Sequence, residues 1–151
     1  MNVYTCLMKI YMQRYYGDEV VTKSRVTIEG TDFRCEAREP AFRDYSETFP
    51  GASKFCLPVG EFLCKPIATE LSPMTLTVMK APAHRSCRFI HDLLCMPHVG
   101  NIVLGMVEDE QDEPEHREMK DSQETWERFQ VHVYEAFQRE EEIMVKISNY
   151  Q

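Results

Sequence analysis

The side chains best suited to chemistry are concentrated in one segment, HRSCRFIHDLLCMPHVGN, between His84 and Asn101. Two thiols and two imidazoles in it are the ligand types of a structural zinc site; they belong to Cys87, His91, Cys95 and His98. A helical segment would place these four side chains on one face. Pro97 would break that helix before the last imidazole, however, and the closely paired cysteines of zinc fingers are absent. We therefore expect no metal and no other cofactor.

A cysteine nucleophile is a second interpretation of the same segment. A reactive thiolate needs a neighbouring imidazole and backbone N–H groups that stabilise an oxyanion. The candidates are Cys95 or Cys87 as nucleophile, His91 or His98 as base, and the amides near Gly100 and Asn101 as oxyanion donors. Cysteine is also among the most buried residue types, so the simpler expectation is that these thiols pack as small apolar side chains.

A third interpretation gives His91 a structural role. Its ring would bond to a loop carbonyl or to the neighbouring Asp92, and the segment would shape a binding surface. We favour this interpretation, because a cysteine and a histidine that are close in sequence do not by themselves define a catalytic pair.

The elements that position this segment are predicted to be mainly β-strands. Residues 3–13 and 20–28 are rich in β-branched and aromatic side chains and flank a Gly17-Asp18 turn, which predicts a hairpin. A third strand is expected over 33–39, with Phe33, Cys35 and Ala37 on the buried face, charged side chains on the other, and its end at Pro40. Further strands are expected within 56–64, 74–80, 88–91 and 101–107. The short apolar runs at 88–91 and 101–107 would also suit a buried helical turn, but we favour strands.

The periodicity changes after residue 121. Apolar side chains then recur at the three-and-four spacing of one helix face: Trp126, Phe129, Val133, Tyr134 and Phe137. Asp121 and Ser122 are expected to cap the helix, with Glu124 completing a capping box. The helix should therefore span about 122–139. Apolar residues alternate again over 143–147, which predicts a closing strand.

These elements predict an α+β fold. We expect a mainly antiparallel β-sheet or small open barrel, with one C-terminal amphipathic helix followed by a short closing strand. A chain of 151 residues with 43% hydrophobic residues is large enough to form one domain over 1–151 with its own core.

The charge of the chain narrows the possible partners. A formal net charge of -8 disfavours binding to nucleic acid, because such proteins replace counterions with clustered lysine and arginine. Seven of the acids lie in 108–118 with one arginine, which predicts a solvated acidic loop over 108–120. No export signal or apolar run of about 20 residues is visible. We expect synthesis in a bacterial cytoplasm, no membrane insertion, and six reduced cysteines.

Two loops are candidate protein-binding surfaces, because aromatic side chains flanked by charge are typical of interfaces. One is the aromatic loop 42–55 and the other is the acidic loop. The residues singled out are Phe42, Tyr45, Phe49, Phe55, Glu108, Asp109 and Glu110. The alternative for the aromatic loop is that its rings only cover the open end of the sheet.

The order of short motifs resembles a small domain family of bacteria and their phages. Pro58-Val59-Gly60 is followed by Phe89-Ile90-His91, then by the segment from Gly100 to Gly105, and then by a helix that starts at a serine. Typical members carry an Ile-His pair and a later Gly-Cys-Ile segment, which is distantly similar to the histidine and cysteine motifs of L,D-transpeptidases. The motif cysteine is Asn101 in this chain, and asparagine cannot act as a thiolate nucleophile.

This resemblance implies a non-catalytic structural or interaction protein of a phage or phage-derived element. Its expected partners are proteins, either phage structural proteins or further copies of itself, in a larger assembly such as a virion. The alternative is a cysteine-dependent acyl transferase or hydrolase acting on cell-wall peptides. In that alternative Cys95 is the nucleophile, His91 the base, and the backbone near Gly100 the oxyanion site.

Overall fold

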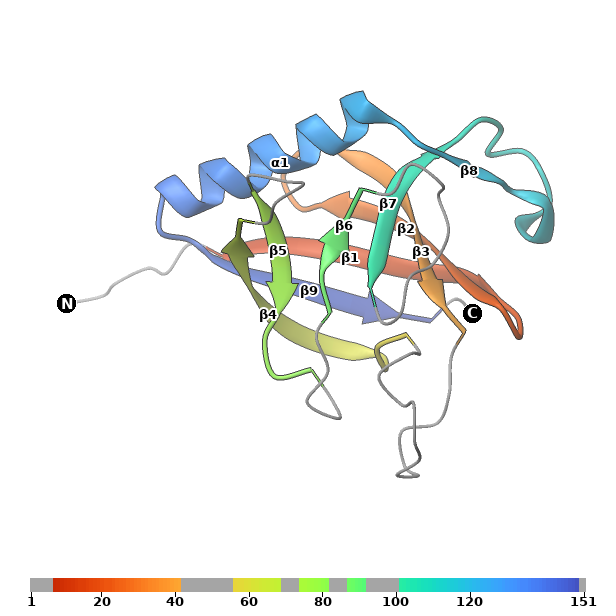
Figure 1. The fold of residues 1–151 in the computed structure, drawn as a ribbon, viewed down its shortest axis with the longest axis horizontal. Coiled ribbons are helices and arrows are strands. Elements are labelled where there is room, and N and C mark those ends of the chain that lie inside the picture. Colours follow the sequence, from red (N-terminus) through yellow and green to blue (C-terminus); the bar gives the residue numbers. More distant parts are fainter. Residues whose placement is uncertain (1–6, 42–55, 69–73, 82–86, 92–100, 150–151) are drawn as a thin grey trace.

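A computed structural model describes residues 7–41, 56–68, 74–81, 87–91 and 101–149 of the chain. Nine strands in these ranges form one curled sheet, a half-barrel, with a single long helix beside it (Figure 1). The strands are β1 (Leu7–Gly17), β2 (Val21–Ile28), β3 (Arg34–Pro40), β4 (Gly60–Ile67), β5 (Thr75–Val78), β6 (Phe89–Ile90), β7 (Ile102–Val107), β8 (Met119–Lys120) and β9 (Glu142–Ser148). The helix α1 spans Gln123–Gln138, and a 3-10 turn, η3, spans Pro114–His116.

The strand order explains why the sheet curls. Its path runs β5-β4-β9-β1-β2-β3-β7-β6, and β8 pairs with β7 beside this path. The β1–β9 and β6–β7 pairs are parallel and the other neighbours are antiparallel. The two ends of the path approach each other at a bridge between Thr77 and Arg88, where the Val78 N–H donates to the Cys87 carbonyl at 2.8 Å. The expected α+β fold, with an open barrel, a C-terminal helix and a closing strand, is confirmed.

The core lies between the inner face of the sheet and the helix. Phe129 of α1 stacks with Phe89 at a ring separation of 5.4 Å, and it also contacts Phe33 at 6.0 Å. Trp126, Val133 and Ala136 complete the buried stripe of the helix. Tyr134 and Phe137 were expected on this stripe but are about half exposed. Each lies one residue after a buried position, and one residue turns the helix by about 100°.

The helix begins as expected, but its cap differs in detail. Ser122 is the N-cap, and its hydroxyl accepts a hydrogen bond from the Thr125 N–H at 3.1 Å. Thr125 therefore occupies the position that a capping box would give to a glutamate, one residue after Glu124. Asp121 lies outside the cap, and its carboxylate faces the His91 ring instead.

Strand β3 is buried on both faces, which the sequence pattern did not predict. Cys35 and Ala37 face the core as expected. Glu36 and Arg38 were expected in solvent, yet they are only 4% and 3% exposed. The segment between β7 and α1 crosses the outer face of the sheet there and covers them, so the outer surface of β3 becomes a second, polar interior.

Candidate interaction surface

The acidic loop was expected over 108–120, but its last two residues form β8, so the loop spans 108–118. It presents its carboxylates to solvent. All seven of its acidic side chains are exposed: Glu108, Asp109, Glu110, Asp112, Glu113, Glu115 and Glu118. The expected solvation of this loop is confirmed. The loop also contains η3, whose His116 N–H donates to the Glu113 carbonyl at 2.8 Å. The backbone of the loop is therefore ordered although its side chains make few contacts.

Lys23 of β2 holds the acidic loop against the outer face of the sheet. Its ammonium donates to the carbonyls of Pro114, Glu115 and Arg117 at 3.1, 3.1 and 2.9 Å. The lysine is only 7% exposed, so its three donors all serve the loop. Burial lowers the pKa of Lys23 from its ordinary value, and the nearby Arg38 guanidinium lowers it further.

A buried polar cluster under the loop adds a second anchor. Arg38 donates to the Arg117 carbonyl at 3.1 Å and to the Glu36 carboxylate at 3.3 Å. The Tyr15 hydroxyl donates to the same carboxylate, and the Arg117 guanidinium lies 4.8 Å from the centre of the Tyr15 ring. Burial raises the pKa of Tyr15, and the hydrogen bond to Glu36 raises it further. Both β2 and β3 thus contribute a cation that binds the loop backbone.

Gly105 allows the end of the loop to cross β7 closely. A Cβ at this position would lie 2.5 Å from the Lys120 carbonyl oxygen and 2.9 Å from Met119 Cγ. Real Cβ atoms do not approach other atoms this closely, so a side chain at Gly105 would push β8 away. Gly105 therefore permits a close backbone approach between β7 and β8.

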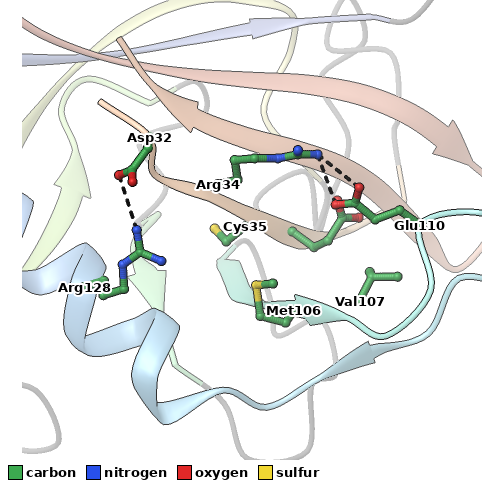
Figure 2. Close-up of a pocket in the computed structure, with 8 residues that line it drawn as sticks. Asp32, Arg34, Cys35, Met106, Val107, Glu110 and Arg128 are labelled. Atoms are coloured by element: carbon green, nitrogen blue, oxygen red, sulfur yellow. Dashed lines mark hydrogen bonds and ion pairs between the residues drawn. The ribbon is translucent and has the colours of Figure 1, made fainter. Parts of the chain in front are cut away.

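A pocket of about 290 Å³ opens beside the acidic loop, between β3, β7 and α1 (Figure 2). Cys35 and Met106 lie between two ion pairs, and Val107 lies on the side of Glu110. Arg34 donates to both Glu110 carboxylate oxygens at 3.1 Å, and Arg128 lies 3.5 Å from the Asp32 carboxylate. Glu110, an expected interaction residue, is therefore part of the pocket wall.

His91 directly follows β6. Its ring is largely buried, stacks on Trp126 at 5.6 Å, and faces the Asp121 carboxylate. Asp121 is a partner that we did not expect, and the expected Asp92 lies outside the described residues. Asn101 is also structural, because its side-chain oxygen accepts a hydrogen bond from the Arg88 N–H at 3.1 Å and so supports the β6–β7 pair.

The other expected chemical residues are only partly described. Cys87 is fully buried, while Cys95, His98 and Gly100 lie outside the described residues. Cys35, Cys56, Cys64 and Cys87 are all buried, as we expected for core cysteines. Burial raises the pKa of Cys64 to about 12, so this thiol stays protonated at neutral pH. In the described part of the chain, no three His, Cys, Asp or Glu side chains gather closely enough to hold a metal ion.

The aromatic loop cannot be compared with its prediction, because Phe42, Tyr45, Phe49 and Phe55 lie outside the described residues. A buried ion pair joins the two described segments that flank this loop in the sequence. Arg14 donates to both Glu39 carboxylate oxygens, at 3.2 and 3.0 Å, and to the Leu57 carbonyl. Both side chains are at most 3% exposed, so this pair fixes β1, β3 and the start of the 56–68 segment relative to one another.

Sequence reasoning missed Lys23, Arg38 and the pocket. A lysine in a strand is ordinarily taken to face solvent, and nothing near position 23 indicates three carbonyl partners about ninety residues later. Gly105 was the one local indication that another chain segment crosses β7.

No helix in the described residues is both long and apolar enough to cross a bilayer. Comparison with protein-family models, curated proteins and solved structures found no match for this chain.

Proposed function

We propose that this chain is a non-catalytic protein-interaction domain that uses its acidic loop to contact a positively charged protein surface. The observation that carries the proposal is the anchoring of the loop by Lys23. A buried ammonium with three carbonyl partners fixes the loop backbone, while all seven acidic side chains remain exposed to solvent. An interaction loop that is ordered in advance loses less conformational entropy on binding.

The charge of the loop supports a basic partner. Exposed carboxylates on one surface attract a complementary surface, increase the association rate and exclude acidic competitors. Glu108, Asp109 and Glu110 begin the loop, and the first and third have cationic neighbours within the chain, Lys120 and Arg34. Ion pairs this exposed contribute only about 0–1 kcal/mol, so a partner can replace the internal cations at little cost.

The narrower proposal, a structural or assembly protein of a phage or phage-derived element, rests on the motif resemblance and on the asparagine at position 101. It predicts association with phage structural proteins or with further copies of this chain. An assembly role is compatible with the hydrogen bond between the Arg88 N–H and the Asn101 side chain, because in a non-catalytic protein this side chain can serve to support strand pairing.

The test is co-purification from the native source at low and high salt, followed by size fractionation and mass spectrometry. The variant Glu108→Gln/Asp109→Asn/Glu110→Gln should lose its partner at low salt. The control Glu19→Gln/Glu29→Gln/Glu140→Gln removes the same charge from exposed positions outside the loop and should keep it. Equal retention by both variants would refute a role for the loop, and recovery only as a free small protein would refute the assembly role.

Cysteine-dependent acyl transfer is the second candidate function, and one observation favours it. The His91 ring faces the Asp121 carboxylate, which is how catalytic histidines are commonly oriented. This candidate predicts that iodoacetamide at neutral pH labels Cys95 much faster than the other five cysteines. Uniformly slow labelling until the protein is denatured would exclude it.

A further inference from the structure

The pocket beside the acidic loop exists because two neighbouring strands separate. The β3–β7 ladder pairs Arg38 with Val103, Ala37 with Leu104 and Glu36 with Gly105, and it ends there. Beyond Gly105, β7 pairs with β8 instead, through Met106 and Val107. On the other strand, Arg34 and Cys35 remain paired with β2 but have no register partner in β7. We call the resulting opening the wedge; its walls are the pocket residues of Figure 2.

The wedge presents a short free edge of β3. In antiparallel sheets successive residues direct their N–H and C=O groups to opposite neighbours, so one of Arg34 and Cys35 directs both groups towards the wedge. Unpaired strand edges of this kind accept an additional extended chain, and main-chain hydrogen bonds supply much of the affinity. The wedge therefore has the hydrogen-bonding pattern of a peptide-binding site.

The size and lining of the wedge favour a short peptide segment. Its volume of about 290 Å³ is at the lower limit of small-molecule sites, which span roughly 300–1,000 Å³, and this disfavours a nucleotide or a large cofactor. Met106 is 39% exposed and lines the wedge together with the buried Cys35 and Val107, so one apolar side chain can pack on it. Burial raises the pKa of the Cys35 thiol, which makes it an apolar part of this lining.

The charges around the wedge favour a basic segment. Arg34–Glu110 and Arg128–Asp32 stand at its two sides, and each of these four side chains is about half exposed or more. Such pairs are weak and exchange partners readily. Glu110 also belongs to the acidic loop, whose other six carboxylates are exposed. A peptide cation on either side of an apolar residue would thus meet carboxylates from both the wedge and the loop.

We propose that the wedge binds an extended, lysine- or arginine-rich segment of the partner protein as an added strand on β3, with an apolar side chain packed on Met106. This inference rests on the proposed function and names the part of the partner that is recognised. A second copy of this chain is disfavoured as the occupant, because each copy carries a net charge of -8 and would bring its own acids to the acidic loop.

The test uses a fluorescein-labelled peptide of alternating lysine and valine, seven residues long, with acetyl and amide ends. We expect saturable binding by fluorescence anisotropy, with the largest amide NMR shifts at Arg34, Cys35 and Met106. A peptide with N-methyl groups at its central residues lacks main-chain donors and should bind about tenfold more weakly, because it loses one or two hydrogen bonds. Replacement of lysine by glutamate should abolish binding.

The variant Met106→Trp fills the wedge and should weaken peptide binding at least tenfold. Met79→Trp is the matched control, because Met79 is 40% exposed and does not line the wedge, and it should bind as the unmodified protein does. Thermal unfolding of both variants establishes that they fold. If Met106→Trp fails to fold, the N-methyl comparison and the NMR shifts on the unmodified protein decide the question. Undiminished binding of the N-methylated peptide, or shifts confined to the acidic loop, overturns added-strand binding.

Failure of this inference is distinguishable from failure of the proposed function. If the loop variant loses the native partner but Met106→Trp retains it, the wedge inference is wrong and the acidic loop remains the contact. If both variants retain the partner, the proposed function is wrong as well. Concentration-dependent dimerisation that Met106→Trp prevents would identify a second copy as the occupant and would overturn the basic segment.

Discussion

Replacement of Lys23 by methionine tests whether the acidic loop is held by a buried cation. The change removes three charge-assisted hydrogen bonds of 2.9 to 3.1 Å but keeps a long, unbranched side chain. One hydrogen bond to a charged group contributes about 1.5–3 kcal/mol, but water can reach the freed carbonyls of this surface loop, so the three losses do not add. We expect the free energy of unfolding to fall by about 2 kcal/mol, which lowers Tm by about 4–8 °C in a chain of this size.

Chemical denaturation and amide hydrogen exchange measure the two consequences separately. Exchange at His116 and Arg117 should accelerate strongly, because their N–H groups bond within the loop that Lys23 anchors. The control is Lys120→Met, which removes an equally charged side chain that is 60% exposed and paired with Glu108. It should cost only about 0–1 kcal/mol. If the two variants lose the same stability and leave loop exchange unchanged, the anchoring mechanism is refuted.

Three further predictions concern the fold around the site. Gly105→Ala should lower the free energy of unfolding by about 1–3 kcal/mol because its Cβ would meet β8. Gly17→Ala is the control and should change the free energy of unfolding little, because a Cβ there would meet no other atom within 4 Å. Equal urea midpoints for the two variants would contradict this prediction. Arg14→Met leaves the Glu39 charge buried and should cost about 3–5 kcal/mol, and adding Glu39→Leu should recover much of the loss; a double variant no more stable than the single one counts against it. The N–H groups of Val21 and then Val20 hold the pKa of Asp18 below its ordinary 3.8, so the folded state favours the carboxylate. Asp18 therefore stabilises the fold above about pH 4, and this contribution is lost as the pH falls through its lowered pKa. In Asp18→Asn the free energy of unfolding should fall less steeply as the pH is lowered. If its pH dependence is unchanged in this variant, the turn contributes nothing to acid stability.

The sequence by itself determined the elements, because their patterns are local. Alternating apolar residues located the hairpin, the third strand and the closing strand, and the serine at position 122 located the start of α1. The acidic loop was also predictable, since seven carboxylates within eleven residues repel one another and remain in water.

Only the tertiary structure decided which charged residues form the site. Along β3 the alternation of charged residues is the same whether those side chains face solvent or a covering loop. The structure places Glu36 and Arg38 beneath the segment after β7 and brings Lys23 to carbonyls 91 to 94 residues away. The wedge forms because β7 pairs with β3 as far as Gly105 and with β8 beyond it. The packing of the whole sheet decides which distant strands pair, so this pairing cannot be predicted from the periodicity within one strand.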